Sequence, residues 1–252
     1  MKRLSCLAIA LLLSVFVAAS ALADHQNVPY QPGEVLTYQL NWEFVPVGTA
    51  VLQVLPVEII NDLPVNHFLV NVATNEVIDT VYKVRDRIDA YANSGMTQSV
   101  LFKKKQREGR TKRDVTVTFD WDRLTAQYSN AGKMRPPIAI RAGTFDPVSL
   151  FYAFRLQDLQ ANSVMEAPVT DGKSLVIGKA RIYGKEWVEI GLGRYETWLV
   201  EPDIKDAGGV FENSQDAQLR VWLTADAYRI PVKVACRASV GHFTAELVSI
   251  RR

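Results

Sequence analysis

Cysteine is scarce in this sequence of 252 residues, which contains only Cys6 and Cys236. Cys6 lies in an N-terminal segment with the pattern of a secretion signal, so the mature chain keeps a single cysteine. An internal disulfide is therefore excluded, and stability must come from an apolar core, which a chain of this length can bury. The apolar stretch 232–236 favours a small buried strand residue at Cys236 over a reactive thiol.

Histidine is also rare, and the three that occur, His25, His67 and His242, lie far apart in the sequence. No pair has the close spacing that zinc sites show. The chain also lacks a G-x-S-x-G elbow, a phosphate-binding P-loop and a complete G-x-G-x-x-G motif. We therefore expect no metal, no cofactor and no enzymatic activity.

Two pairs of carboxylates have a spacing that acid–base chemistry could use, namely Asp120 with Asp122 and Glu186 with Glu189. Such chemistry requires carboxyl groups held in a shielded site with different proton affinities. The first pair flanks an expected turn and the second lies along an expected strand. Both pairs therefore fit solvated polar faces better than a catalytic centre.

No apolar run is long enough to span a bilayer as a helix, which takes about 20 residues. The longest run, residues 7–19, follows Lys2 and Arg3 and precedes the small-residue pattern Ala21-Leu22-Ala23. This order is typical of a cleaved secretory signal peptide. We expect residues 1–23 to be removed and residues 24–252 to form one soluble, β-rich domain in the periplasm.

The chain has no large excess of charge of either sign, with 29 Lys and Arg against 27 Asp and Glu. Removal of the signal takes away two basic residues, which leaves a neutral mature protein. A neutral balance argues against nucleic-acid binding. We expect a monomer whose partners are a lipid or hydrophobic small molecule, or an anionic membrane or lipopolysaccharide surface.

One segment departs from this balance, because residues 103–113 hold seven basic residues and one acid. The strands 99–106 and 114–121 on either side predict a long hairpin around this segment. A solvated strand edge protected by lysines is the favoured explanation of the charge, and docking on anionic lipid or lipopolysaccharide is the alternative. The docking candidates are Lys103, Lys104, Lys105, Arg107, Arg110, Lys112 and Arg113.

Most of the mature chain shows the period-two alternation of half-buried strands. Leu36, Tyr38, Leu40 and Trp42 fall on one face, for example, and Asp171-Gly172 is a strong hairpin signal. One further strand is expected over residues 175–183, ended by Gly184, with a separate strand over residues 187–190. The predicted fold is mainly β, either an antiparallel β-barrel or a strongly curved sheet.

A single short buried helix is expected at about residues 147–156. Asp146 is a good N-cap and Pro147 suits the first helical position. The residues that follow are apolar around most of the helix circumference, so the helix should pack against a sheet on nearly every side. We expect it to plug the β structure, with Phe145, Phe151 and Phe154 filling the interior.

Three groups of residues resemble the bacterial domain-of-unknown-function family 3108. The groups are residues 33–38 with Trp42 and Gly48, residues 146–155, and residues 221–226 with 229–233 and Gly241. The resemblance spans nearly all of the mature chain. It implies a secreted, mostly β envelope protein with no agreed activity, so it transfers no catalytic residue.

Three functional hypotheses remain. The first is a non-enzymatic binder of a lipid or other hydrophobic ligand, with Arg155, Tyr152, Trp42 and Trp222 as candidate ligand residues. Arg155 also fits a core salt bridge or a helix C-cap. The second hypothesis is a structural or interaction protein of the envelope with a filled core. The third is an enzyme of unrecognised type.

Overall fold

A computed structural model describes residues 28–204, 217–238 and 241–252 of the chain, and the expected signal peptide lies outside these residues. The described part contains fifteen strands and two short helices. Neither helix is long and apolar enough to cross a membrane. The helices are α1 (Glu76–Asp79) and α2 (Pro147–Arg155). The strands are β1 (Val35–Trp42), β2 (Val45–Ile60), β3 (Leu63–Thr74), β4 (Arg85–Asn93), β5 (Ser99–Glu108), β6 (Thr111–Asp120), β7 (Thr125–Asn130), β8 (Lys133–Met134), β9 (Ile138–Ala139), β10 (Ser163–Thr170), β11 (Leu175–Ile190), β12 (Gly193–Pro202), β13 (Gln218–Thr224), β14 (Pro231–Ala238) and β15 (Gly241–Arg251).

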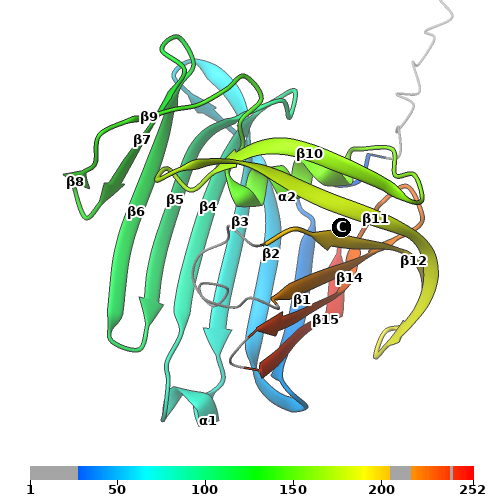
Figure 1. The fold of residues 1–252 in the computed structure, drawn as a ribbon. Helices are drawn as coiled ribbons and strands as arrows, with labels where there is room; N and C mark the ends of the chain where they lie inside the picture. Colours follow the sequence, from blue (N-terminus) through cyan, green and yellow to red (C-terminus); the bar gives the residue numbers. More distant parts are fainter. Residues whose placement is uncertain (1–27, 205–216, 239–240) are drawn as a thin grey trace, which may run out of the picture.

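All the strands belong to one antiparallel sheet in the order β10-β11-β12-β13-β14-β15-β1-β2-β3-β4-β5-β6-β7-β8, with β9 paired to β7. The sheet curls around α2, and β10 and β11 cross over the helix (Figure 1). The terminal strands β8 and β10 do not pair with each other. The expected mainly β fold is confirmed, and it takes the form of a strongly curved sheet that does not close.

Side chains that alternate along the strands build the inner face of this sheet. Leu36 and Tyr38 of β1 are buried, as the alternation predicts. Phe102 of β5 lies opposite Val117 of β6, and both side chains are buried. Apolar residues two apart along each strand therefore share the inner face.

One predicted boundary is wrong, because β11 runs without interruption through Gly184. The pairing of β11 with β12 shifts between Ile182 and Gly184, so Tyr183 is an extra residue in the ladder. Gly184 has a φ of 154°, which residues with a Cβ rarely adopt. The glycine therefore bends the strand at a bulge and does not end it.

The expected helix is confirmed over Pro147–Arg155, with Asp146 as its N-cap. The Asp146 carboxylate accepts the backbone N–H groups of Val148 and Ser149, each at 2.9 Å. Ser99 of β5 donates its hydroxyl to the same carboxylate at 2.6 Å and accepts the Asp146 N–H at 2.7 Å. The helix start is thus fixed both by its own cap and by a strand of the sheet.

The buried face of α2 differs in part from the expected one. Tyr152 is fully buried, whereas Phe151 and Phe154 are half-buried. The Tyr152 ring stacks on Phe68 of β3 at a centroid distance of 3.9 Å, and Tyr30 meets it edge-on at 5.0 Å. Aromatic pairs in these geometries pack favourably beyond their buried area. Tyr152 is therefore the central residue of the plug.

Three clusters of buried side chains occupy the inner face of the sheet. One lies between α2 and strands β2 to β7, and a second joins α2 to β10 to β14. The third brings Ile190 and Val188 of β11 against Leu36 of β1 and Leu247 of β15. Because α2 contributes to two of the three clusters, the helix connects the two halves of the curved sheet.

Tyr152→Ala should lower the free energy of unfolding by about 3 to 5 kcal/mol, the usual effect of truncating a buried aromatic residue. Chemical denaturation followed by tryptophan fluorescence would measure the change. Tyr183→Ala is the matched control, since that ring is 40% exposed, and it should change stability far less. Equal losses in the two variants would show that α2 is not the central plug.

The buried position of Asp146 predicts a pH dependence. Burial raises the pKa of this carboxyl above its ordinary value, and the hydrogen bonds from Ser149, Ser99 and Val148 only partly oppose that rise. A pKa that is higher in the folded chain means that ionisation of Asp146 destabilises the fold as the pH rises. Asp146→Asn cannot ionise.

Asp146→Asn should therefore gain stability relative to wild type as the pH rises from about 4, the ordinary aspartate pKa, to neutrality. Urea denaturation across this range would measure the difference between the two proteins. Asp122→Asn, at an exposed turn, should follow the wild-type profile. A constant difference between Asp146→Asn and wild type would contradict the prediction.

Candidate functional site

Arg155, the leading candidate for a ligand contact, is fully buried and ion-paired within the core. Its Nη1 donates to Glu34 Oε1 at 2.7 Å and its Nη2 donates to Oε2 at 3.2 Å. The same Nη2 donates to the carbonyl oxygens of Pro29 and Tyr228 at 2.8 and 3.1 Å. The structure thus places Arg155 in a core salt bridge, one of the three roles that the sequence left open.

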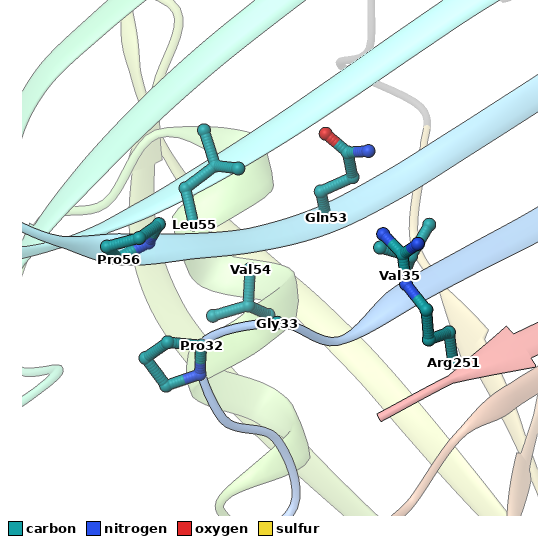
Figure 2. Close-up of a pocket in the computed structure, with 8 residues that line it drawn as sticks. All are labelled: Pro32, Gly33, Val35, Gln53, Val54, Leu55, Pro56 and Arg251. Atoms are coloured by element: carbon teal, nitrogen blue, oxygen red, sulfur yellow. The ribbon is translucent and has the colours of Figure 1, made fainter.

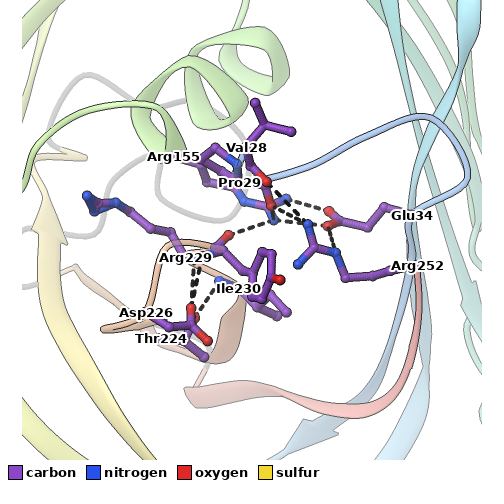
Figure 3. Close-up of polar contacts among 10 residues, drawn as sticks. Val28, Pro29, Glu34, Arg155, Thr224, Asp226, Arg229, Ile230 and Arg252 are labelled. Carbon is purple, nitrogen blue, oxygen red and sulfur yellow. Dashed lines mark hydrogen bonds and ion pairs between the residues drawn. The ribbon is translucent and has the colours of Figure 1, made fainter. Parts of the chain in front are cut away.

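A second cation completes this buried network. Arg252 Nε lies 3.3 Å from Glu34 Oε2, and its Nη2 donates to the Pro29 carbonyl at 3.1 Å. Its guanidinium also covers the Tyr228 ring at 3.8 Å from the centroid. Figure 3 shows the two arginines converging on one glutamate from different parts of the chain. We call Arg155, Glu34 and Arg252 the core ion network.

The other candidate ligand residues do not meet at one site. Tyr152 is enclosed by the plug, and Trp42 lies half-exposed at the end of β1. Trp222 of β13 is half-buried, and its indole N–H donates to Glu186 of β11. Arg155 and Tyr152 therefore lie in the core, whereas Trp42 and Trp222 lie at two other places.

The two most defined pockets are depressions on the surface. The first, of about 310 Å³, lies where the chain before β1 crosses β2 (Figure 2). It is lined by Pro32, Gly33, Val35, Gln53, Val54, Leu55, Pro56 and Arg251. The second, of about 330 Å³, lies beside the turn between β13 and β14 and includes Arg194, Glu196 and Asp226. The first pocket borders the core through Val54, which belongs to the cluster between α2 and β2 to β7.

The described residues contain no group of three or more His, Cys, Asp and Glu side chains arranged to hold a metal ion. His67 is the one buried histidine among them, and it lies between Glu58 and Asp89 at 2.6 and 3.0 Å. Its ring stacks on Tyr91 at 4.2 Å. Cys236 is half-buried, and burial raises the pKa of its thiol.

The basic hairpin forms as expected, with β5 and β6 joined at Gly109 and Arg110 and each strand longer than predicted. It is not an edge of the sheet, since β5 lies between β4 and β6, and β6 pairs with β7 from Val115 onward. Only the tip of β6 extends past β7. The interpretation as a protected sheet edge therefore applies to the tip alone.

The basic side chains of this hairpin divide between its two faces. Lys104 and Arg113 share the inner face with the buried residues Phe102 and Val115, because side chains alternate along a strand. The Lys104 ammonium lies 3.9 Å from the buried Asp86 carboxylate. The remaining candidates lie on the outer face or at the turn, namely Lys103, Lys105, Arg107, Arg110 and Lys112.

The hairpin tip is attached to the segment that follows α1. Gly109 donates its N–H to the Lys83 carbonyl at 2.8 Å, and Val84 forms a bridge with Glu108. A Cβ on Gly109 would lie 2.7 Å from the Tyr82 ring, so only glycine allows this close approach. The basic tip and the α1 segment therefore form one surface.

The first turn of α1 is tied to the turn between β1 and β2. Asn75 caps α1 by accepting the Ile78 N–H at 3.0 Å. It also donates its side-chain amide to Pro46 at 2.8 Å and its backbone N–H to Val47 at 3.0 Å. Figure 1 shows α1, the β1–β2 turn and the β5–β6 turn together at the lower end of the sheet.

This end carries the three most exposed large apolar side chains of the described chain, Phe44 at 95%, Val81 at 86% and Val77 at 74%. Val45 and Tyr82 beside them are more than half exposed. We define the rim as these five apolar residues together with Lys83, Arg110 and Lys112. The sequence pointed to the basic residues only. Phe44, a large apolar residue at an expected turn, is the sequence feature that could have indicated the apolar part of the rim.

The β2–β3 turn at the opposite end of the sheet is also partly apolar, but the charges directly beside it are acidic. Ile59 and Leu63, beside the β2–β3 turn, are 67% and 63% exposed. Glu58 and Asp62 flank them and are exposed. The rim and the β2–β3 turn thus expose similar apolar side chains beside charges of opposite sign.

Comparison with known proteins places this geometry in a wider group. A family model described as "Protein of unknown function (DUF3108)" matches residues 37–248. A crystal structure of a beta-barrel-like protein of domain of unknown function DUF1849 from Brucella abortus aligns with a TM-score of 0.56 at 8% identity, covering 87% of this chain and 97% of that chain. A "putative lipoprotein" from Parabacteroides distasonis aligns with a TM-score of 0.38 at 10% identity, covering 89% and 98%. A comparison with curated proteins gives no match.

The core ion network predicts a strong asymmetry between breaking and replacing the Arg155–Glu34 pair. Glu34→Gln should destabilise the protein by about 3 to 5 kcal/mol, because it leaves buried guanidinium groups without a counter-charge. Combining it with Arg155→Met should cost less than the sum of the two single changes. Denaturant titration of the four proteins would measure this coupling.

Glu166→Gln serves as the matched control, since Glu166 pairs with Lys179 at 2.7 Å on the surface with both side chains half exposed. That change should alter the free energy of unfolding by less than about 1 kcal/mol. Additive effects of Glu34→Gln and Arg155→Met would disprove the coupling.

Proposed function

The chain belongs to the DUF3108 family of unknown function, and we propose that it is a non-enzymatic protein of the cell envelope that acts through its surface. An internal ligand has no part in this proposal. The observation that carries it is the filled inner face of the sheet, where three side-chain clusters and α2 occupy the space. A binder of an acyl chain needs an enclosed apolar cavity instead.

The placement of the candidate ligand residues supports this function. The two terminal nitrogens of Arg155 donate to Glu34, Pro29 and Tyr228, so an anionic head group would have to displace Glu34. Among the carboxylates considered for acid–base work, Asp120 pairs with Arg123 at 3.1 Å and Glu186 accepts the Trp222 indole. These groups are engaged structurally. The envelope location is supported by the signal-like pattern of residues 1–23.

A second candidate function, binding of a hydrophobic small molecule, is favoured by the pocket in Figure 2. Pro32, Val35 and Leu55 give it an apolar wall and Arg251 a cation. Its volume of about 310 Å³ lies at the lower limit of ligand pockets, which start near about 300 Å³. The pocket fits a small molecule or one end of a lipid.

Lipid extraction would decide between these functions. Protein purified from the bacterial periplasm without detergent should yield no lipid at one molecule per chain when it is denatured and extracted for mass spectrometry. It should also take up no fluorescent fatty acid. A stoichiometric lipid that disappears in Leu55→Asp, and stays in the matched surface variant Val248→Asp, would overturn the proposed function and favour the pocket.

A further inference from the structure

We propose that the rim docks the protein on the surface of an anionic lipid bilayer. In this arrangement Phe44, Val77 and Val81 enter the head-group layer, and Arg110, Lys112 and Lys83 contact lipid phosphates. The inference rests on the proposed function, because it names the partner of a protein that acts through its surface. The proposed contact with lipid combines the exposed apolar residues of the rim with the basic residues of the hairpin tip.

Highly exposed apolar side chains are concentrated at the rim. Phe44, Val81 and Val77 exceed every other large apolar side chain of the described residues in exposure. They lie on the β1–β2 turn and the α1 segment, which Asn75 joins through Pro46 and Val47. A cluster of this kind marks an interaction site more often than scattered apolar residues do.

The charges beside this cluster determine which surface fits it. Lys83, Arg110 and Lys112 form no ion pair with any described residue. Two acids at the same end are already engaged, because Asp79 pairs with Arg85 and Glu43 accepts the His242 N–H at 2.9 Å. Glu76 on α1 is exposed and opposes the contact.

The charges beside the exposed apolar side chains indicate which end of the sheet faces an anionic lipid. Both ends expose apolar side chains, but Ile59 and Leu63 at the β2–β3 turn stand beside the acids Glu58 and Asp62. An anionic bilayer repels that turn and attracts the rim, since basic residues near such a surface each contribute attraction. Apolar side chains flanked by cations are the pattern of interfacial membrane binding.

The rim is also held rigidly enough to act as one unit. The Gly109 N–H bond to Lys83 and the packing of Gly109 on Tyr82 fix the basic tip against the α1 segment. Thr74 and Arg85 both bind Asp79, which anchors α1 to strands β3 and β4. Docking therefore requires little ordering of the protein, which lowers the entropic cost of binding.

Vesicle flotation tests this proposal on the full mature protein. Wild type should bind vesicles of equal parts phosphatidylglycerol and phosphatidylcholine, and it should not bind pure phosphatidylcholine. Binding should weaken as salt rises, because the Debye length falls from about 30 Å at 0.01 M to about 8 Å at physiological salt. Absence of binding, or binding that ignores lipid charge and salt, would overturn the proposal.

Two double variants, each with a matched control, separate the contributions of charge and of apolar contact to vesicle binding. Arg110→Gln with Lys112→Gln should weaken binding about fivefold for each charge removed, whereas Arg123→Gln with Arg141→Gln, away from the rim, should bind like wild type. Phe44→Ser with Val81→Ser should weaken binding at least about tenfold and keep its salt dependence. Ile59→Ser with Leu63→Ser, at the opposite end, should have no effect.

All of these residues are exposed, so every variant should melt like wild type. Rim variants that float like wild type, or controls that lose binding equally, would disprove the docking surface. A protein partner would then be the alternative occupant of the rim. This outcome is distinct from failure of the proposed function, which requires a stoichiometric internal lipid in the extraction experiment.

Discussion

The buried ion pair between Arg155 and Glu34 is the interaction on which the rest of the structure depends. It joins the end of α2 to the segment before β1, while Arg252 and the Tyr228 carbonyl bring in the regions around β15 and β14. A buried charge is strongly destabilising when its partner of opposite charge is removed. The four segments must therefore reach their positions together, and α2 cannot leave the inner face without exposing this network.

The same constraint explains why the interior is occupied although the sheet does not close. A curved sheet with unpaired terminal strands leaves an apolar inner face that needs a cover. The helix supplies it through Tyr152, and the bulge at Gly184 bends β11 back over the helix. With the inner face covered by core side chains, the three most exposed large apolar groups, Phe44, Val77 and Val81, lie together at one end of the sheet. The sign of the neighbouring charges distinguishes this end from the β2–β3 turn at the other.

Local features were predictable from the sequence, and distant pairings were not. Asp146 and Pro147 located the helix within one residue, because capping depends on adjacent residues. The partner of Arg155 was hidden, since Glu34 lies 121 residues earlier in the chain. Gly184 was misjudged as a strand end, because a bulge and a break share the same residue type. The rim escaped prediction because strand order alone brings Phe44, Val81 and Arg110 to one end.

The pairing of β1 with β15 has a consequence for folding kinetics. Every other neighbouring pair in the sheet joins strands that are consecutive, or one apart, in the described sequence. Strands β1 to β9 and β10 to β15 are thus two meanders whose contacts join strands close in sequence, which favours rapid formation. Their union requires Leu36 to meet Ile250 across most of the chain. The slow, entropically demanding step of folding is therefore concentrated in one ladder.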